Sequence, residues 1–357
     1  MRDYLYSLAK DDNRGFMVNA IKTFLFILSY IYSLIASILI FLYRLKPYRL
    51  DCKVISVGNI TLGGTGKTSL VEFMAKYLKQ QGHKVAILSR GYKRRNTQYS
   101  IRNPSYETMG DEPYMLKVNL GDIPVIVDAN RIRAAGLAMR DYGVDTVILD
   151  DGFQQWKIKK DLEVITIDST NPFGNRYLLP RGILREPISS LKRSDIFVLT
   201  QTNLNPDTQD IQYFLNEINP EALIIESIHS PLGFYRMDKK DILLKPDALA
   251  GKTVTLFSGI GNPDSFENLI IRLGINIGLS FRFPDHYAYT QKDLENIIGD
   301  SRKKNIDTLV TTEKDATRLS ALAVTNSPLP VLVLRVALAI SKDEQKFHNR
   351  LLQLYSV

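Results

Sequence analysis

A glycine-rich run that ends in lysine and threonine carries the clearest chemical signal in the sequence. The apolar segment Val54–Val57 leads into Gly58-Asn59-Ile60-Thr61-Leu62-Gly63-Gly64-Thr65-Gly66-Lys67-Thr68, and an amphipathic stretch follows. This order of strand, loop and helix is the context of a P-loop, whose backbone N–H groups cradle phosphates. Glycines allow a phosphate to approach the backbone without meeting a side chain. We therefore predict a nucleotide site built from Gly63, Gly64, Thr65, Gly66, Lys67 and Thr68.

The side chains of this loop have distinct expected roles. We expect Lys67 to reach the β- and γ-phosphates of ATP and to act in catalysis, and the Thr68 hydroxyl to bind Mg²⁺. The positive end of the following helix adds to anion binding. The loop departs from the usual pattern at Thr61, where the first glycine normally stands. A dinucleotide-binding fingerprint is not indicated, since Ser69 stands where its last glycine or alanine belongs.

An acidic pair at a strand end is the expected metal-binding partner of this loop. The apolar run Thr146–Leu149 leads directly into Asp150-Asp151-Gly152-Phe153-Gln154. One aspartate in this position holds Mg²⁺ directly or through water in P-loop enzymes. Two aspartates after a strand are also typical of a turn, and the P-loop upstream favours the metal role.

Basic residues are concentrated in two other segments. Arg90 and Lys93 follow a predicted strand end, and Arg185 lies in a loop rich in proline and glycine. A solvated surface is the ordinary interpretation of such residues. We expect all three to contact phosphates of the nucleotide or the substrate, Arg90 and Lys93 as nucleotide-binding residues and Arg185 as a catalytic residue.

Further strings follow the glycine-rich loop along the chain: Ser89-Arg90-Gly91-Tyr92-Lys93, Gly110-Asp111-Glu112-Pro113, Asp150-Asp151-Gly152-Phe153-Gln154, Leu184-Arg185-Glu186-Pro187, Phe283-Pro284-Asp285-His286-Tyr287 and Thr311-Thr312-Glu313-Lys314-Asp315. Together, and in this order, these strings resemble the tetraacyldisaccharide 4′-kinase family, which phosphorylates the lipid A precursor. The resemblance covers nearly the whole chain. One departure is Gln155, where the family usually has histidine.

This resemblance implies further site residues. Asp111 and His286 form the family's catalytic dyad, which deprotonates the sugar hydroxyl, and His286 is expected to come from a second domain. Taken alone, Asp111 ahead of Glu112-Pro113 is also typical of a helix N-cap, and His286 of an ordinary loop residue. The metal-associated residues that the resemblance implies are Glu112, Asp150, Asp151 and Gln154.

Short apolar runs that alternate with amphipathic stretches must position these residues. This pattern predicts an α/β fold with a mostly parallel sheet, similar to P-loop NTPases, plus a second, smaller α/β domain. Helical spacing is clearest between Leu70 and Leu78, with Gly82 as the expected stop. We expect an N-terminal membrane-associated helix in residues 1–48, a P-loop kinase domain in 49–220, a linker in 221–250 and a C-terminal α/β domain in 251–357.

The stretch Thr23–Tyr43 contains no charged residue. As a helix it would be about 31 Å long, close to the thickness of the hydrocarbon core of a bilayer. It is too long for the apolar part of a signal peptide, and a buried core helix is the alternative. Four basic residues flank it on each side, so the charges leave open its orientation and whether it spans or only dips into the bilayer.

Composition sets the outer limits on function. The chain has 357 residues and a net charge of +8, which suits anionic partners such as phosphates and membrane surfaces. A single cysteine excludes an internal disulfide, and four histidines leave little material for a zinc site. No recognisable nucleic-acid-binding module is present. The oligomeric state cannot be read from the sequence.

Two functions remain in competition. The first is phosphorylation, by ATP and Mg²⁺, of the 4′-hydroxyl of an acylated glucosamine disaccharide 1-phosphate, giving lipid IVA. Such an enzyme would lie at the inner membrane with its catalytic domains on the cytoplasmic face. The second is a membrane-tethered P-loop switch that acts on a protein partner. A guanine-specific switch should carry N-K-x-D, which is absent, and Thr312-Glu313-Lys314-Asp315 does not fit.

Overall fold

The chain folds into two compact units in a computed structural model that describes residues 15–91, 105–319 and 327–356. Unit 1 contains residues 1–90, 123–228 and 338–357, and unit 2 contains residues 91–122 and 229–337. This division differs from the expected boundaries. Residues 91–122 belong with unit 2, and the C-terminal residues 338–357 belong with unit 1.

Unit 1 is built on a parallel sheet in the order β7-β6-β5-β1-β4-β2-β3. Nearly every residue of its central strands is buried, so both faces are covered, as is typical of parallel sheets. The predicted parallel α/β architecture is therefore confirmed. The strands are β1 (Lys53–Gly58), β2 (Val85–Ser89), β3 (Val125–Val127), β4 (Thr146–Asp150), β5 (Leu162–Asp168), β6 (Ile196–Thr200) and the first part of β7 (Leu223–Arg236).

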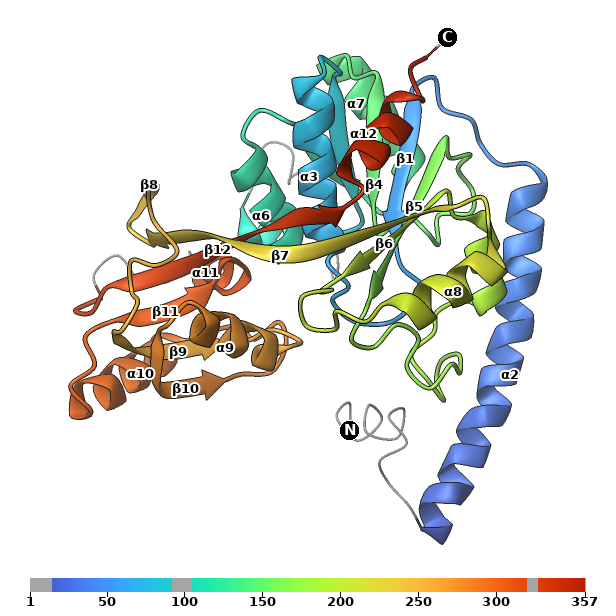
Figure 1. The fold of residues 1–357 in the computed structure, drawn as a ribbon. Helices are drawn as coiled ribbons and strands as arrows, with labels where there is room; N and C mark the ends of the chain where they lie inside the picture. Colours follow the sequence, from blue (N-terminus) through green and yellow to red (C-terminus); the bar gives the residue numbers. More distant parts are fainter. Residues whose placement is uncertain (1–14, 92–104, 320–326, 357) are drawn as a thin grey trace. The chain divides into compact units, whose positions relative to one another are not determined.

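Helices cover this sheet. α3 (Lys67–Gln80) packs on β1, β2 and β4, and α7 (Arg131–Tyr142) packs on β2 and β3. The predicted helical face from Leu70 to Leu78 lies within α3, and Gly82 has a left-handed φ of 91° just after it. Among its described residues, unit 1 also contains η1 (Ile188–Arg193), α8 (Gln209–Ile218) and α12 (Glu344–Leu352), and Figure 1 labels α8 and α12.

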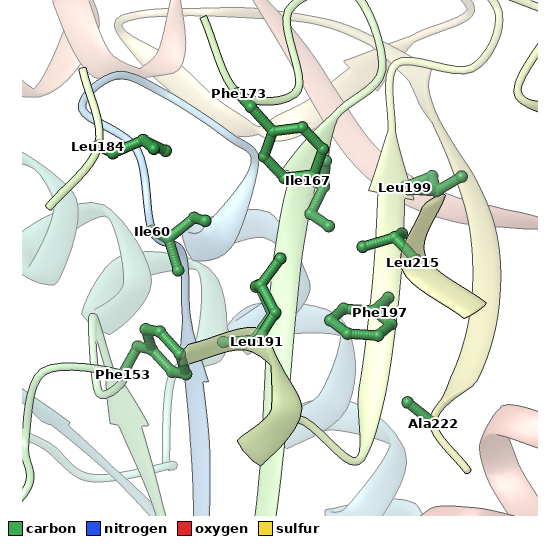
Figure 2. Packing of buried hydrophobic residues seen from close by; sticks show 11 residues of the cluster. Ile60, Phe153, Ile167, Phe173, Leu184, Leu191, Phe197, Leu199, Leu215 and Ala222 are labelled. Carbon is green, nitrogen blue, oxygen red and sulfur yellow. The ribbon is translucent and has the colours of Figure 1, made fainter. Parts of the chain in front are cut away.

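One buried cluster joins the segments that carry the candidate site of unit 1 (Figure 2). Ile60 comes from the glycine-rich loop, Phe153 from the loop after β4, and Leu184 from the segment that precedes Arg185. These side chains pack with Leu191 of η1 and Phe197 of β6. Three loops that are distant in sequence are thereby held on one apolar support.

The apolar N-terminal segment forms α2 (Phe16–Leu45), the long helix of unit 1 drawn in blue (Figure 1). By length and composition it is able to cross a membrane, and only Leu25, Ser29 and Ala36 are buried. Large side chains elsewhere on it are exposed, for example Phe24 at 60% and Phe41 at 65%. The buried-core alternative therefore does not describe this helix.

The strands of unit 2 continue the same sheet in the order β10-β9-β11-β12-β7, with β8 antiparallel to β7. β9, β10, β11 and β12 form parallel pairs. The strands are β8 (Lys239–Leu244), β9 (Thr253–Ser258), β10 (Asn276–Arg282), β11 (Leu309–Thr312) and β12 (Val331–Lys342). The helices are α5 (Tyr106–Met109), α6 (Asp111–Leu120), α9 (Pro263–Arg272), α10 (Gln291–Lys303) and α11 (Glu313–Leu319).

Candidate functional site

The glycine-rich loop of unit 1 ends where α3 begins, at Lys67. Gly63 and Gly66 have left-handed φ values of 115° and 78°, which explains why glycine stands at these two positions. The Thr65 hydroxyl lies 2.7 Å from that of Thr166 on β5, so the loop is tied to the sheet beneath it. The result is a helix N-terminus that opens onto a fixed loop, the arrangement that binds phosphate groups.

The backbone around Thr61 explains the missing first glycine. Thr61 forms an antiparallel bridge with Leu184, and its neighbour Leu62 donates an N–H to the Ile183 carbonyl at 2.7 Å. The Arg185 N–H in turn donates to the Ile60 carbonyl at 2.6 Å. An extended, paired backbone accepts a β-branched residue, so glycine is not needed here. The same bridge holds Arg185 beside the loop.

Arg185 and Lys67 converge on one aspartate of the predicted acidic pair. Arg185 Nη1 and Nη2 donate to the two carboxylate oxygens of Asp151 at 2.9 and 2.8 Å, and Lys67 Nζ lies 3.7 Å from Asp151 Oδ1. Burial alone would raise the pKa of Asp151, but the Arg185 hydrogen bonds and the Lys67 charge hold it well below its usual range. Both cations also contact Asn59, a residue that sequence reasoning did not single out.

A buried glutamate supports the rest of this acidic loop. Glu186 is fully buried and accepts hydrogen bonds from Gln154 Nε2 at 3.2 Å, Trp156 Nε1 at 3.0 Å and Arg193 Nη2 at 2.8 Å. Gln154 Nε2 also donates to the Asn59 carbonyl at 3.1 Å. The hydrogen bond to Glu186 therefore holds the Gln154 side chain in place. Its place next to Arg185 in the resemblance was the only sequence signal for it.

The oxygen atoms at this site fit a hard cation. Asp150 is buried at the end of β4 and accepts from Ser89 Oγ at 3.1 Å, and Gln154 Oε1 is buried with no hydrogen-bond partner in the described part of the chain. Thr68 adds a hydroxyl. Within residues 15–91, 105–319 and 327–356, no group of three histidine, cysteine, aspartate or glutamate side chains could form a closed metal cage. Mg²⁺ normally binds through one or two carboxylates plus substrate phosphates, which this donor set allows.

The second pair of predicted residues meets in unit 2. His286 Nδ1 lies 2.8 Å from Asp111 Oδ2, although we expected the two residues to come from different domains. Asp111 is the first residue of α6, and the N-cap is Gly110 with a φ of 87°. The N-cap interpretation of Asp111 is thus wrong, because its carboxylate turns toward the imidazole instead of capping the helix.

The charges around this pair fix the position of its proton. Burial alone would raise the pKa of Asp111, but hydrogen bonds from His286 and Arg318 and the Arg318 charge hold it well below its usual range. An ionised carboxylate only accepts hydrogen bonds, so Nδ1 of His286 carries the proton and Nε2 of the neutral ring holds the lone pair. The Asp111 hydrogen bond also raises the pKa of His286 above its usual value. The His286 side chain is 46% exposed, and its Nε2 lies 3.8 Å from Asp285 Oδ2.

The other predicted residues are divided between the units. Glu112 lies in unit 2, where Lys314 Nζ donates to it at 2.5 Å, whereas Asp150, Asp151 and Gln154 lie in unit 1. Its metal role stays a prediction. Arg90 is exposed in unit 1, and Lys93 lies outside the described residues.

Two basic residues of α11 were missed by sequence reasoning. Lys314 and Arg318 both contact the first turn of α6. The available signal was helical spacing, since Arg318 follows Asp315 by three residues and so shares its helix face.

A parallel sheet whose strand β1 leads through a glycine loop into a helix defines the class of P-loop nucleotide-binding proteins. Comparison with known proteins narrows this class. The sequence profile of the family described as tetraacyldisaccharide-1-P 4'-kinase (LpxK) matches residues 21–356. The chain therefore belongs to the tetraacyldisaccharide-1-P 4'-kinase family, a family of kinases.

Individual relatives extend over most of the chain. It is 38% identical over 344 residues to the tetraacyldisaccharide 4'-kinase of Halothermothrix orenii, covering 90% of this chain and 88% of the relative. It is 36% identical over 311 residues to that of Elusimicrobium minutum, covering 82% and 81%. A crystal structure of "apo" form LpxK from Aquifex aeolicus in complex with ATP matches with a TM-score of 0.75 and 29% identity, covering 94% of this chain and 100% of that one. The family predicted from the sequence is confirmed.

Proposed function

We propose that this kinase transfers the γ-phosphoryl group of ATP to the 4′-hydroxyl of a tetraacylated glucosamine disaccharide 1-phosphate. The observation that carries the proposal is the Asp111–His286 hydrogen bond, which leaves Nε2 of an exposed histidine as a proton acceptor. A sugar hydroxyl is a weak nucleophile, so a positioned base assists its attack on phosphorus. Family membership supplies the substrate class.

In the proposed reaction, unit 1 holds the nucleotide. Backbone N–H groups from Gly63 to Thr68 and the N-terminus of α3 bind the phosphates. Lys67 and Arg185 currently share Asp151, and both cations are within reach of a phosphate placed at the loop. The ATP complex of the Aquifex aeolicus relative supports ATP as the donor. Neutralisation of charge on the transferring group is the main contribution of these residues.

Mg²⁺ is the metal that the donor set favours. Thr68, Asp150 and Gln154 would hold it through their side-chain oxygens, with Asp151 and Glu112 as further candidates. Held by these residues, Mg²⁺ would neutralise the charge that develops on the transferred phosphoryl group. Asp151 is engaged by Arg185 on both oxygens, and this favours Asp150 as the direct ligand.

Unit 2 supplies the base. Nε2 of His286 accepts the proton of the sugar hydroxyl, while Asp111 fixes the ring through Nδ1 and stabilises the imidazolium that forms. The hydroxyl oxygen bonds to the γ-phosphorus as the bond from phosphorus to the β-phosphate oxygen breaks. General-base assistance of this kind contributes about 10²–10⁴-fold to a rate.

We further propose that α2 holds the enzyme at the cytoplasmic face of the inner membrane, where its acylated substrate resides. Its apolar surface and its length support this location. Beside its C-terminal half lies a cavity of about 550 Å³, lined by Ile40, Phe41 and Leu45 together with Arg44 and Lys192. Apolar and cationic groups side by side suit a lipid that carries both acyl chains and a phosphate.

The decisive experiment uses the full chain in mixed micelles with radiolabelled ATP and the purified disaccharide 1-phosphate. We expect label to move to the lipid, and to move only when both Mg²⁺ and lipid are present. Hydrolysis of ATP without any label on the lipid would contradict the proposal and would favour the membrane-tethered switch.

A further inference from the structure

Arg318 is a buried arginine that contacts Asp111 and the backbone carbonyl to which His286 is hydrogen-bonded. Its side chain is only 1% exposed, and it lies on α11 of unit 2. Nε donates to Asp111 Oδ2 at 2.8 Å, and Nη2 lies 2.6 Å from the same oxygen. Nη1 donates to the Gly259 carbonyl at 2.7 Å. That carbonyl also accepts the backbone N–H of His286 at 3.1 Å.

A second carboxylate fixes Arg318 from the opposite side. Asp315 is fully buried and accepts from Arg318 Nη1 at 3.0 Å. The same carboxylate accepts the Gly259 N–H at 3.0 Å, the Tyr289 hydroxyl at 3.0 Å and the Thr312 hydroxyl at 2.6 Å. Asp315 therefore joins Arg318 to the end of β9, so the guanidinium has little freedom to rotate.

We propose that Arg318 is a positioning residue, which holds Asp111 in the orientation that places His286 for proton abstraction, with Asp315 as its anchor. This inference rests on the proposed base function of the dyad. Because the Arg318 side chain is only 1% exposed, we assign it no contact with the substrate. It acts through Asp111 on one side and through the His286 backbone, by way of the Gly259 carbonyl, on the other.

The geometry requires an arginine. One planar guanidinium reaches Asp111, Asp315 and Gly259 at the same time, with separate N–H groups for each. A lysine ammonium at the end of a flexible chain is a single point charge, and it cannot keep all three partners at hydrogen-bond distance. Replacement of the guanidinium group by an ammonium group should therefore release Asp111, even though the positive charge is kept.

The charge of Arg318 has a second effect on the imidazole. The charged groups that face His286 are Asp111 on α6, Asp285 in its own loop and Arg318 on α11. Lys314 faces Asp285, and Tyr106 on α5 faces Asp111. The two carboxylates raise the pKa of His286, and Arg318 opposes them. Without the arginine, more of the histidine would be protonated at neutral pH and unable to act as a base.

A double-mutant cycle separates positioning from plain structural support. We expect Arg318→Lys to lower kcat by about 100-fold with the KM for ATP within about twofold, because a small misplacement of a catalytic group has effects of this size. In the Asp111→Asn background, the same substitution should cause almost no further loss, since the interaction that it removes is already broken. Equal losses in both backgrounds would show that Arg318 only supports the fold.

Control variants keep the test decisive. Arg282→Lys changes an exposed arginine of the same unit that pairs with Glu267, and it should retain wild-type turnover. Thermal melting reports whether each variant folds. If Arg318→Lys does not fold, Asp315→Asn removes the anchor instead, and its loss of kcat should likewise disappear in the Asp111→Asn background. Undiminished kcat in a folded Arg318→Lys protein would overturn the proposal.

The pH profile gives an independent measurement. Activity should rise with pH as His286 loses its proton, and Arg318→Gln should move this rise upward by about one pH unit. An unmoved profile would contradict the electrostatic part of the inference. If wild type and Arg282→Lys do not label the lipid at all, the proposed function fails, an outcome distinct from failure of the Arg318 inference.

Discussion

Two candidate functional residues share an unusual backbone conformation. Asp151 and His286 have φ values of 55° and 60°, in the left-handed region that non-glycine residues rarely occupy. Each follows a strand, and each carries a side chain that is central to the candidate site of its own unit. Backbone strain of this kind persists where many surrounding contacts hold the residue in that conformation, and it is concentrated at functional sites.

Lys67 gives the most direct test of the nucleotide site. We expect Lys67→Ala to abolish phosphoryl transfer, because the charge opposite the β- and γ-phosphates is lost. Initial rates with radiolabelled ATP measure the effect. Lys76→Ala, on the same helix and paired with Glu72, is the matched control and should leave the rate unchanged. Equal rates for the two variants would remove Lys67 from the mechanism.

The dyad predicts a particular dependence on pH. The pKa of His286 is raised above 6.5, so at acidic pH the ring is protonated and cannot accept a proton. The kcat of the wild type should therefore increase through a midpoint above 6.5. In Asp111→Asn the rise should lie at lower pH, with kcat lower by about 10²–10⁴-fold and the affinity for ATP preserved. A loss of ATP binding alone would contradict the base role.

At the scale of the elements, close packing joins β1 to the acidic loop. A Cβ atom at Gly58 would come within 2.6 Å of the Phe153 backbone nitrogen and Cβ. We expect Gly58→Ala to destabilise the protein by about 1–3 kcal/mol, since overpacking forces backbone shifts. Urea unfolding measures the change. Gly136→Ala in α7 meets open space and should be neutral or stabilising by up to about 1 kcal/mol, so similar losses in both variants would refute this explanation.

Apolar runs predicted most strands, and the exceptions have physical reasons. β10 is exposed along much of its length and contains Gly278 and Ser280, so it lacks the apolar run that marks a buried strand. β7 and β8 lie in the segment where we expected a linker. β7 is a strand of 14 residues, but Pro231 and Gly233 interrupt its apolar pattern, so the sequence did not indicate it. Sheet edges and strands interrupted by proline or glycine carry weak signals.

Apart from the Asp111–His286 pair, which the family resemblance implied, the candidate site was predictable only where its chemistry is local in sequence. The glycine loop and the acidic pair each form one continuous string, and their positions in the fold follow from it. Arg318 and Glu186 are buried through tertiary contacts. The spacing from Asp315 places Arg318 on a helix face, but neither this spacing nor the neighbours of Glu186 distinguish a buried arginine or glutamate from the exposed ones that are far more common.

Ser29 and Tyr32 on α2 attach this helix to the loop that carries Arg185. The Ser29 hydroxyl donates to the Leu178 carbonyl at 2.7 Å, and the Tyr32 hydroxyl donates to the Arg185 carbonyl at 2.9 Å. We expect Tyr32→Phe to raise the KM for ATP a few-fold by loosening Arg185, as a lost hydrogen bond of about 1 kcal/mol implies. Tyr30→Phe, at an exposed position on the same helix, is the control, and equal KM values would contradict this coupling.

At the scale of the whole molecule, the helix predicts where the protein resides. Deletion of residues 1–43 should release the protein from vesicles in a flotation assay, because the exposed apolar surface of α2 is removed. The remaining chain is still basic, so the assay is done at high salt to screen attraction to anionic lipids. A truncated protein that still floats would show that another surface is sufficient.

The contacts of α2 have a practical consequence for anyone preparing a detergent-free catalytic fragment. Removing the helix strips hydrogen-bond partners from the backbone of Leu178, Arg181 and Arg185, groups that its hydroxyls satisfy in the intact chain. Solubility would be gained at the expense of the segment that orients Arg185. Polar substitutions at the exposed positions Phe24 and Leu34 lower the hydrophobicity of the helix and leave Ser29 and Tyr32 in place, so they are the better engineering route.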